Sequence, residues 1–460
     1  MGDENKRRKP QVLIFPFPLQ GHINPMLQFA KRLASKGVKA TLVTTVFLSK
    51  SSFSDMSDAS IDLQTISDGF DECGYNGAPS GGEVYLQTFW SVGPKSLASL
   101  IKRLVDTGDH PVGAIVYDGF LSWTLDVAKQ FGVPSAVFFT QSCSVNSTYY
   151  HVNRGHLRLP LPRDSTVSLP GLPPLRVSEL PSFIYDYGSS PTWFDVFVNQ
   201  FSNIDGADWV FFNTFYELEK EVLDWMSSFW NVLTIGPTIP SMYLDKRLEN
   251  DTGYGVNLFE PETSACLSWL DGKPKGSVVY VSFGSLASLE AEQMEEIALG
   301  LKGAECNFLW VVRGTIEKNK LPSRFIEETK EKGLVVSWCH QLEVLSHGSI
   351  CCFLTHCGLG STLEALSLGV PMLAMPLWTD QIMNAKQVED VWGVGIKVRQ
   401  NEKGLVTREM IQQCLKELVK GEKAKETKEN AMKWKNLAKK AMEEGGSSDK
   451  NMDEFVAKLL

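Results

Sequence analysis

The chain has 460 residues and is too long for a domain with a single hydrophobic core. Two domains of about 200 residues each are therefore expected. Its residues are 43% hydrophobic and 22% charged, a balance that is typical of a folded protein and excludes a disordered one. The formal net charge of −9 argues against a nucleic-acid partner, because such proteins usually present a basic face.

Nine cysteines, an odd number without a metal-like CxxC pair, favour free thiols in a reducing compartment. The residues before Pro10 lack the apolar stretch of a signal peptide. No segment approaches the roughly 18 uncharged apolar residues that a membrane-spanning helix requires. These features predict a cytoplasmic protein without a membrane span.

The first half of the chain alternates short apolar runs with helical patterns. Val12–Phe15 is typical of a buried parallel strand. The loop Pro16–Pro25 follows, and Asn24 as an N-cap with Pro25 at the first helical position predicts a helix that ends at Gly37. The same rhythm predicts a strand at Thr41–Thr44, a strand at Ala114–Tyr117, a helix at Ser122–Phe131 and a strand at Ser135–Phe139.

The second half starts the alternation afresh. It predicts strands at Ser277–Phe283, Phe308–Val312, Leu334–Ser337, Ile350–Thr355 and Met372–Met375, and helices at Glu290–Leu301, Leu342–Ser346 and Ser361–Leu368. Two such blocks indicate an α/β protein with two doubly wound domains. We place the first domain at residues 1–240, a polar linker at residues 241–258 and the second domain at residues 259–446.

Ligands of open α/β sheets bind beyond the carboxyl ends of the strands. The residues expected at these ends are Gln20–His22, Asp118 and Thr140 in the first block, and Gly284–Ser285, Trp338 and Thr355–Gly358 in the second. Polar, titratable and glycine residues therefore gather at one edge of each sheet. Two such edges that face each other form a cleft.

His22 is a candidate general base, because an imidazole can accept a proton at neutral pH. Asp118 is the nearest candidate carboxylate to fix its tautomer and to stabilise the imidazolium. Each residue also has a structural interpretation, His22 as a capping residue before Asn24 and Asp118 as a helix N-cap. Their shared position on one sheet edge favours the catalytic interpretation.

The loop Gly358–Thr362 is a candidate anion site at the start of a helix. Its glycines let backbone N–H groups approach an anion, and a helix N-terminus favours negative charge. No lysine follows, as one would in a Walker loop, and the loop does not follow the first strand, as GxGxxG does in dinucleotide-binding proteins. With His356 before it and Glu364 one turn into the helix, it becomes a candidate site for a nucleotide diphosphate.

The stretch Trp338–Gln381 resembles the signature box of the plant family-1 UDP-glycosyltransferases. The matching positions are Trp338–Gln341, His347, Phe353–Gly358, Ser361–Glu364, Gly369–Pro371, Pro376 and Asp380–Gln381. Further landmarks of this family are matched by Gln20–Pro25, Tyr117–Asp118 and Phe283–Ser285, so the resemblance covers essentially the full length. Thr379–Gln381 and Val388–Gly395 resemble the subgroup that glucosylates carboxylic acids, steroids and terpenoids.

The resemblance implies a GT-B fold, in which two Rossmann-like domains face across a cleft, with the acceptor on the first and UDP-glucose on the second. It implies that His22 is the base and Asp118 its partner, and that residues 447–460 cross back onto the first domain. For the nucleoside of the donor it implies uracil stacking on Trp338 and ribose contacts from Gln341 and Glu364. It implies diphosphate contacts from Ser285, His356 and Ser361, and sugar contacts from Thr140, Asp380 and Gln381. Cys339, Gly358 and Gly360 complete the implied donor site.

The sequence departs from the family mainly at two adjacent positions of the box, and in a smaller way at His340, where the family often has proline. The family normally reads His-Cys-Gly-Trp-Asn-Ser, whereas this chain has Leu359 in place of the tryptophan and Gly360 in place of the asparagine. The backbone N–H groups remain, so we expect weaker donor binding without loss of the reaction.

The acceptor pocket is expected to be apolar and aromatic, as suits a lipophilic scaffold. The candidate residues are Phe17, Ile23, Tyr85, Phe89, Phe120, Gln141, Phe183, Phe197 and Trp378, each of which also has an interpretation as a core residue.

The expected reaction is a single inverting displacement without a metal, by an enzyme that acts as a monomer. Three alternatives stay open: a nucleotide-sugar binder without turnover, a dinucleotide oxidoreductase, and a related transferase that makes a C- or N-glycoside or uses another sugar. The presence of His22 and Asp118 argues against the first, and the loop Pro16–Gly21, which is not GxGxxG, argues against the second.

Overall fold

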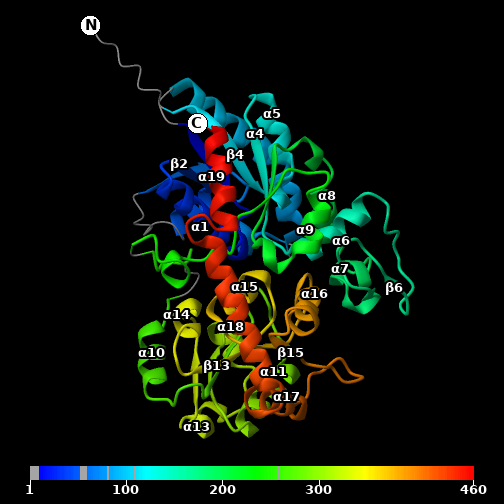
Figure 1. Ribbon diagram of the computed structural model, residues 1–460, viewed down its shortest axis with the longest axis vertical. Helices are drawn as coiled ribbons and strands as arrows, with labels where there is room; N and C mark the ends of the chain where they lie inside the picture. The colour runs from blue at the N-terminus through cyan, green and yellow to red at the C-terminus, as the bar shows by residue number, and fades with distance from the viewer. Residues whose placement is uncertain are drawn as a thin grey trace.

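Two parallel sheets, one above the other in Figure 1, organise the chain. The structure, a computed structural model, describes residues 10–51, 60–79, 82–107, 110–249, 251–255 and 260–459. Of the expected linker at 241–258, residues 250 and 256–258 lie outside the described residues, as do residues 1–9 and residue 460.

The first sheet has seven strands in the order β3-β2-β1-β4-β5-β8-β9, and all neighbours are parallel. Its strands are β1 (Gln11–Phe15), β2 (Lys39–Thr45), β3 (Ile61–Ile66), β4 (Val112–Asp118), β5 (Ser135–Phe139), β8 (Trp209–Phe212) and β9 (Val232–Thr234). The chain winds outward from β1 in one direction and from β4 in the other. The carboxyl ends of these two neighbours therefore flank the crevice where doubly wound sheets bind ligands.

The second sheet has six strands in the order β12-β11-β10-β13-β14-β15, again all parallel. Its strands are β10 (Val278–Ser282), β11 (Asn307–Val311), β12 (Gly333–Val336), β13 (Ile350–Thr355), β14 (Met372–Ala374) and β15 (Gly395–Lys397). Here the winding reverses between β10 and β13.

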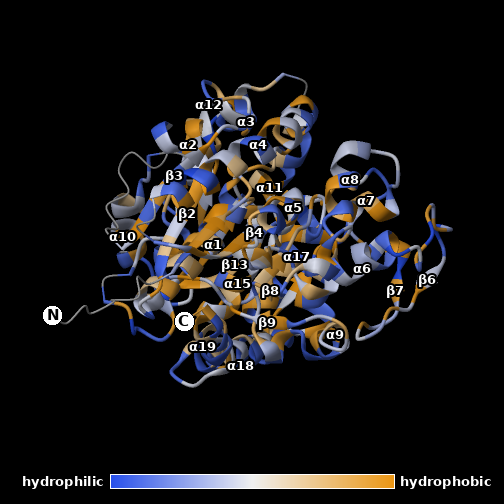
Figure 2. Ribbon diagram, turned by 90° about the horizontal axis from the view of Figure 1, so that it is seen from above, coloured by the Kyte–Doolittle hydropathy of each residue, from blue (hydrophilic) through white to orange (hydrophobic). Residues whose placement is uncertain are grey.

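Each sheet is covered by helices on both faces, because successive side chains of a strand point to opposite sides. Leu13 and Phe15 of β1 pack into one core, whereas Val12 and Ile14 pack into the other. The helices of the first unit are α1 (Gln20–Ser35), α2 (Val46–Ser51), α3 (Gly74–Gly77), α4 (Glu83–Thr107), α5 (Trp123–Gln130), α6 (Cys143–Asn153), α7 (Ser182–Tyr185), α8 (Pro191–Asn199) and α9 (Lys220–Met226). In Figure 2 the hydrophobic colour concentrates on the central strands and on the helix faces toward them.

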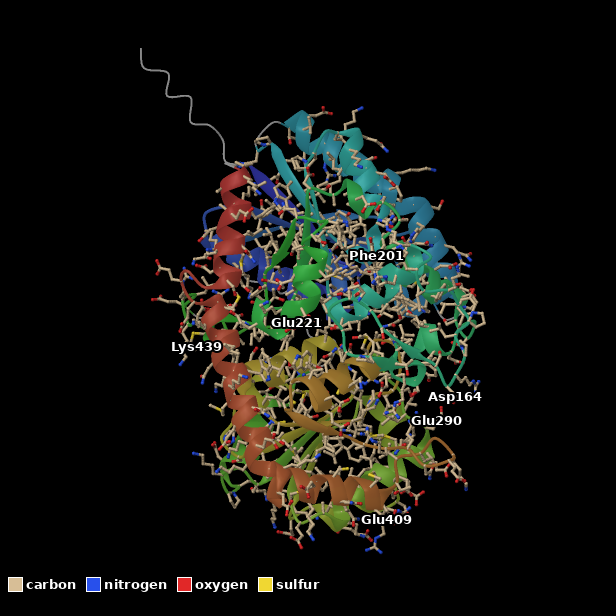
Figure 3. The ribbon with its side chains drawn as sticks, turned by 45° about the vertical axis from the view of Figure 1, so that its right-hand side comes forward. Asp164, Phe201, Glu221, Glu290, Glu409 and Lys439 are labelled. Carbon is tan, nitrogen blue, oxygen red and sulfur yellow. The ribbon has the colours of Figure 1, made fainter. Side chains whose placement is uncertain are left out.

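The second unit is layered in the same way, since Val278 and Tyr280 of β10 face one core and Val279 and Val281 face the other. Its helices are α10 (Thr263–Asp271), α11 (Ala291–Gly303), α12 (Gly314–Lys318), α13 (Phe325–Thr329), α14 (Gln341–Leu345), α15 (Leu359–Leu368), α16 (Gln381–Lys386), α17 (Arg408–Lys420) and α18 (Lys423–Met442). Figure 3 shows Phe201, which is fully buried, inside the first unit, whereas Asp164 and Glu409 lie at the periphery.

All nine predicted strands are confirmed, with ends shifted by at most a few residues. Four strands of the two large sheets were not predicted, namely β3, β8, β9 and β15. β3 lies at an edge and mixes polar with apolar residues, and the other three have only three or four residues each. Such short or mixed runs carry little periodicity to detect.

The predicted start of the first helix at Asn24 and Pro25 is wrong. Helix α1 begins at Gln20, after the extended Leu19, and Pro25 lies inside it. The backbone N–H groups of His22 and Ile23 both donate to the Leu19 carbonyl at 2.9 Å. The apolar stripe of the helix already begins at Ile23, so burial extends the helix back past the proline. His22 consequently lies in the first turn of a helix and not in a loop.

The end of the chain returns to the first sheet. Helix α18 packs on the second unit and is followed by α19 (Ser447–Leu459), which runs along the first unit in Figure 1. Phe455 is fully buried there, with its ring 5.0 Å from that of Phe211 and 5.1 Å from that of Trp209. None of the described helices is long and apolar enough to cross a membrane.

Truncation of Phe455 tests the role of this final helix. Phe455→Ala is expected to lower the free energy of unfolding of the first unit by about 3 kcal/mol, because it removes a buried ring and leaves a cavity. Denaturant unfolding monitored by the fluorescence of the buried tryptophans measures this loss. The half-exposed Phe131 provides the matched control, and equal effects of Phe455→Ala and Phe131→Ala would contradict the assignment.

Candidate active site

A cavity of about 680 Å³ lies between the two units and is lined by residues of both. Every residue predicted to bind the donor lines it: Thr140, Ser285, Trp338, Cys339, Gln341, His356, Gly358, Gly360, Ser361, Glu364, Asp380 and Gln381. His22 lines it from the first unit. Residues predicted from the strand ends of two different sheets therefore line the same cavity.

His22 and Asp118 form a hydrogen-bonded pair at the crevice of the first sheet. Nδ1 of His22 lies 2.6 Å from Oδ2 of Asp118, and Oγ1 of Thr140 lies 3.1 Å from the same nitrogen. Because the carboxylate accepts the Nδ1 proton, Nε2 is the ring nitrogen that can accept a proton from a bound molecule.

The surroundings of this pair fix its geometry. Asp118 is almost fully buried at the end of β4, and its Oδ1 accepts the backbone N–H of Phe120 at 3.0 Å. The rings of Phe17 and Phe120 lie 5.5 Å and 4.8 Å from the His22 ring. The imidazole is therefore held at Nδ1 by Asp118 and Thr140 and lies against aromatic rings, which leave it few orientations.

On the opposite wall, Glu364 of α15 is held by Gln341 of α14. Nε2 of Gln341 donates to Oε2 of Glu364 at 2.7 Å and to Oγ of Ser361 at 2.9 Å. The Tyr280 hydroxyl donates to Oε1 of the same Gln341 side chain at 3.3 Å. The half-buried Trp338 lines the cavity just before α14. The wall thus offers an aromatic ring, an amide and a carboxylate side by side.

Burial raises the pKa of Glu364 from its ordinary value of 4.5 to about 7. Hydrogen bonds from Gln341 and Tyr254 favour the charged form and oppose this rise. The carboxyl group therefore changes charge close to neutral pH.

His356 lies where the second sheet reverses its winding, between two glycines. A Cβ on Gly284 would come within 2.7 Å of the His356 ring, and one on Gly358 within 2.6 Å, so neither position admits a larger residue without displacement. Burial and, to a smaller extent, the nearby charge of Arg313 lower the pKa of His356 to about 4. The ring is therefore neutral at physiological pH, and its Nδ1 is buried without a hydrogen-bond partner among the described residues.

The N-terminus of α15 opens onto the cavity beside His356. Gly358 is the cap residue, and the Leu359 side chain is buried in the core of the second unit. A Cβ on Gly360 would meet no atom within 4 Å. The space beside the first helical turn, which a side chain at position 360 would occupy, is therefore open.

Asp380 and Gln381 begin α16 on the same side of the cavity. Asp380 accepts hydrogen bonds from Thr379 Oγ1 and Asn384 Nδ2, both at 2.7 Å, and burial raises its pKa. The backbone N–H of Thr379 donates to Oγ of Ser182 in the first unit at 2.8 Å. This contact ties the α16 turn to the first unit.

The predicted acceptor residues divide into three groups. Phe120, Gln141, Phe197 and Trp378 line the cavity. Phe17 and Phe183 lie behind these residues, against His22 and Trp378 respectively.

Ile23, Tyr85 and Phe89 do not reach the cavity. Ile23 faces the core on the other side of the first sheet, because it follows His22 by one position on a helix and so points about 100° away. Tyr85 and Phe89 lie in the packed core, where the Tyr85 hydroxyl donates to Asp68 at 2.6 Å.

Several cavity residues escaped the sequence interpretation. Trp193 of α8 lines the cavity and lies edge-on to Phe17 at 6.4 Å. Arg313 does not itself line the cavity, but it follows β11 and donates to the carbonyl of the lining residue Ser285, so the strand-end rule would have found it. Tyr254 lies in the linker, where no local pattern marks it.

All nine cysteines are free thiols. Among the residues that the structure describes, no group of three or more His, Cys, Asp or Glu side chains is arranged to hold a metal ion.

Comparison with known proteins identifies the family. A family model described as UDP-glucoronosyl and UDP-glucosyl transferase matches residues 248–443. Mogroside I-E synthase of Siraitia grosvenorii is 49% identical over 450 residues, 97% of this chain and 98% of that protein. Flavonol 7-O-beta-glucosyltransferase UGT74F1 of Arabidopsis thaliana is 48% identical over 459 residues, 99% of each chain.

The chain belongs to the plant family-1 UDP-glycosyltransferases. The crystal structure of Os79 from O. sativa in complex with UDP matches this enzyme with a TM-score of 0.92 at 38% identity, over 98% of this chain and 100% of that one. The predicted family and the GT-B fold are therefore confirmed.

Replacement of Glu364 by glutamine tests its burial through stability. The folded state disfavours the charged carboxylate. The free energy of unfolding of the wild-type protein is therefore not lowered by this group below about pH 4.5, and it is lowered by the full amount above about pH 7. Glu364→Gln is expected to stabilise the ligand-free enzyme increasingly between these values and by a constant amount, about 3 kcal/mol, at higher pH. Calorimetric unfolding near pH 5 and pH 8, with the exposed Glu402→Gln as control, measures the difference; a pH-independent effect would refute it.

Proposed function

We propose that this enzyme is an inverting glucosyltransferase that moves glucose from UDP-glucose to a small lipophilic acceptor. The observation that carries the proposal is the His22–Asp118 pair of the first unit, which faces, across one cavity, the helix N-terminus and the Glu364–Gln341 pair of the second. Residues 1–240 then bind the acceptor, and residues 259–446 bind the donor.

The role of general base for His22 is supported by its hydrogen bond to Asp118. The buried carboxylate fixes the ring so that Nε2 is unprotonated and can take the acceptor proton, and it stabilises the imidazolium that results. In this proposal Asp118 orients the ring and does not itself take the acceptor proton, as for the partner of an imidazole base in hydrolases.

The donor site is supported by complementary chemistry at each part of UDP-glucose. An aromatic face such as that of Trp338 suits a flat base, and the carboxylate of Glu364 suits the vicinal diol of ribose. The α15 N-terminus and the neutral His356 ring, whose Nδ1 has no partner among the described residues, offer N–H groups to the diphosphate, together with Ser285 and Ser361. Asp380, Gln381 and Thr140 line the same cavity and offer hydrogen-bonding groups to the sugar hydroxyls.

The proposed reaction is one displacement. As His22 Nε2 removes the acceptor proton, the acceptor oxygen bonds to the anomeric carbon, and the bond from that carbon to the diphosphate oxygen breaks on the opposite face. UDP leaves with the electron pair, and its charge is stabilised at the α15 N-terminus. Inversion of the anomeric centre yields a β-glucoside.

The acceptor class follows from the cavity and from the relatives. Phe120, Trp193, Phe197 and Trp378 provide apolar rings, and Gln141 provides a polar group for orientation. One relative is named a mogroside I-E synthase and another a flavonol 7-O-beta-glucosyltransferase, and Os79 has been solved in complex with a trichothecene. We therefore propose a hydroxyl or carboxyl group of a terpenoid, steroid or phenolic as the acceptor. We expect a cytoplasmic monomer that requires no metal and binds no nucleic acid.

Removal of the base separates two acceptor classes. His22→Ala is expected to lower kcat for a hydroxyl acceptor by a factor of about 100 or more, because an alcohol must lose its proton during attack. A carboxylic acid is already ionised, so ester formation should fall far less. Steady-state rates with a matched pair of such acceptors, with the exposed His156→Ala as control, measure the contrast. Equal losses on both acceptors would contradict the assignment of His22.

Restoring the family's asparagine tests the open space in the donor site. Gly360→Asn is expected to tighten UDP-glucose binding, by about tenfold if one charge-assisted hydrogen bond to phosphate forms, since the added side chain meets no atom in the ligand-free enzyme. Calorimetric titration with UDP gives the affinity. Gly360→Ala is the control for the loss of glycine flexibility, and unchanged or weaker binding by the asparagine variant would mean that another residue already serves the phosphate.

A further inference from the structure

The segment Asp251–Gly255, here called the strap, lies between the first helix and the donor side of the cavity. Four of its residues, Thr252–Gly255, line the cavity together with His22 and Glu364. The strap belongs to the polar linker, which separates the two units along the chain. Its position at the site therefore calls for a physical cause.

Polar side chains of α1 fix the strap to the first unit. Nε2 of Gln28 donates to the carbonyl of Gly253 at 2.8 Å, and Nζ of Lys31 forms an ion pair with Asp251 at 3.0 Å. Both members of the ion pair are largely buried, with side-chain exposures of 14% and 6%. A buried pair of this kind resists separation more than a surface pair does.

The strap also approaches the side chain of Asn24 on α1 closely at Gly255. This residue has φ +72°, and a Cβ there would lie 1.7 Å from Oδ1 of Asn24. Only glycine fits without displacement. Asn24, Gln28 and Lys31 follow one another on one face of the helix that carries His22 in its first turn.

From this fixed segment, the half-buried Tyr254 reaches across to the second unit. Its hydroxyl is hydrogen-bonded to the carboxylate of Glu364, which also accepts a hydrogen bond from Gln341. Burial, and then the charge of Glu364, raises the pKa of Tyr254, so the phenol keeps its proton and is the donor in this bond.

We propose that Tyr254 is a positioning residue for the donor: its hydroxyl holds the Glu364 carboxylate in the ionised form that a ribose diol requires, and the strap ties that carboxylate to the helix of His22. This inference rests on the proposed function in one respect, namely that Glu364 receives the ribose.

The hydrogen-bond capacity of Glu364 supports the proposal. An ionised carboxylate offers about four acceptor positions. Gln341 and Tyr254 use two, which leaves two for the vicinal hydroxyls of a ribose. A protonated carboxyl group would turn one acceptor into a donor and fit the diol poorly.

Burial makes the ionised form hard to keep. The pKa of Glu364 is about 7 even with both hydrogen bonds in place, so loss of either bond raises it further. The groups that face Glu364 are Tyr254 from the strap, Tyr280 from β10, Gln341 from α14 and Ser361 on its own helix. Of these, Tyr254 is the one that comes from outside the second unit.

Tyr254→Phe, probed with uridine, tests this role. Uridine carries the ribose but no phosphate that titrates near neutral pH. If the lost bond moves the pKa of Glu364 from about 7 to about 8, the ionised fraction at pH 7 falls about fivefold, and the uridine affinity should fall by the same factor. The loss of uridine affinity should grow toward pH 6. It should nearly vanish by about pH 8.5, where Glu364 is mostly ionised in both the wild type and the variant. Calorimetric titration across this range measures it.

Two further variants separate positioning from general damage. Tyr216→Phe removes a phenol hydroxyl that donates to a carboxylate away from the cavity, that of Asp224 at 2.9 Å, and should leave uridine binding unchanged. Gly255→Ala displaces the strap at Asn24 and should reproduce the pH-dependent deficit. Combined with Tyr254→Phe, it should add little, because both changes break the same bond.

Different results would overturn different parts of the proposal. A pH-independent deficit would assign Tyr254 a merely structural role, and tighter binding would show that its hydroxyl competes with the ribose. Either result, or unchanged affinity, overturns the inference. Glu364→Ala serves as the reference: if it leaves uridine binding unchanged, the proposed donor site itself fails, whereas a loss with Glu364→Ala alone would remove only the role of Tyr254.

Discussion

The parallel pairing of β1 with β4 is the constraint on which the rest of the site depends. It brings the carboxyl ends of two strands together, so that His22 and Asp118, which are 96 positions apart in sequence, come within 2.6 Å. The pairing of β10 with β13 does the same for Gly284 and His356 in the second unit. In both sheets the backbone hydrogen bonds are satisfied within the ladder, which frees the loops beyond it to present side chains to a ligand.

The site contains two largely buried carboxyl groups, those of Glu364 and Asp380. Burial raises the pKa of Glu364 and of Asp380, and neighbouring amides and hydroxyls partly offset this cost by donating hydrogen bonds to each carboxylate. Gln341 and Asn384 are these amides, at 2.7 Å in each case. Acceptors that are desolvated and held in advance need little reorganisation when a polyhydroxylated ligand arrives.

The two units meet through contacts that extend each core into the other. Leu342 of α14 packs into a core of the first unit, and so does Met383 of α16, although both helices belong to the second. The hydrogen bond between Thr379 and Ser182, the strap on α1 and the return of α19 join them elsewhere. Because these connections join the two units both beside the cavity and away from it, the distance between the His22 and Glu364 walls depends on packing throughout the molecule.

The sequence by itself determined the alternation of strands and helices, the signature box and the residues at the strand ends. These are local properties, because apolar runs predict strands and short motifs contain the residue types that their chemistry requires. The start of α1, the exclusion of Tyr85 from the cavity and the role of Tyr254 were decided by tertiary structure alone. Burial of Ile23 outweighed a helix-start signal, aromatic residues in a core and in a pocket look identical in sequence, and the strap gains its position only from a helix more than 200 positions earlier. Contacts between distant segments have no local signature, which is why packing had to decide them.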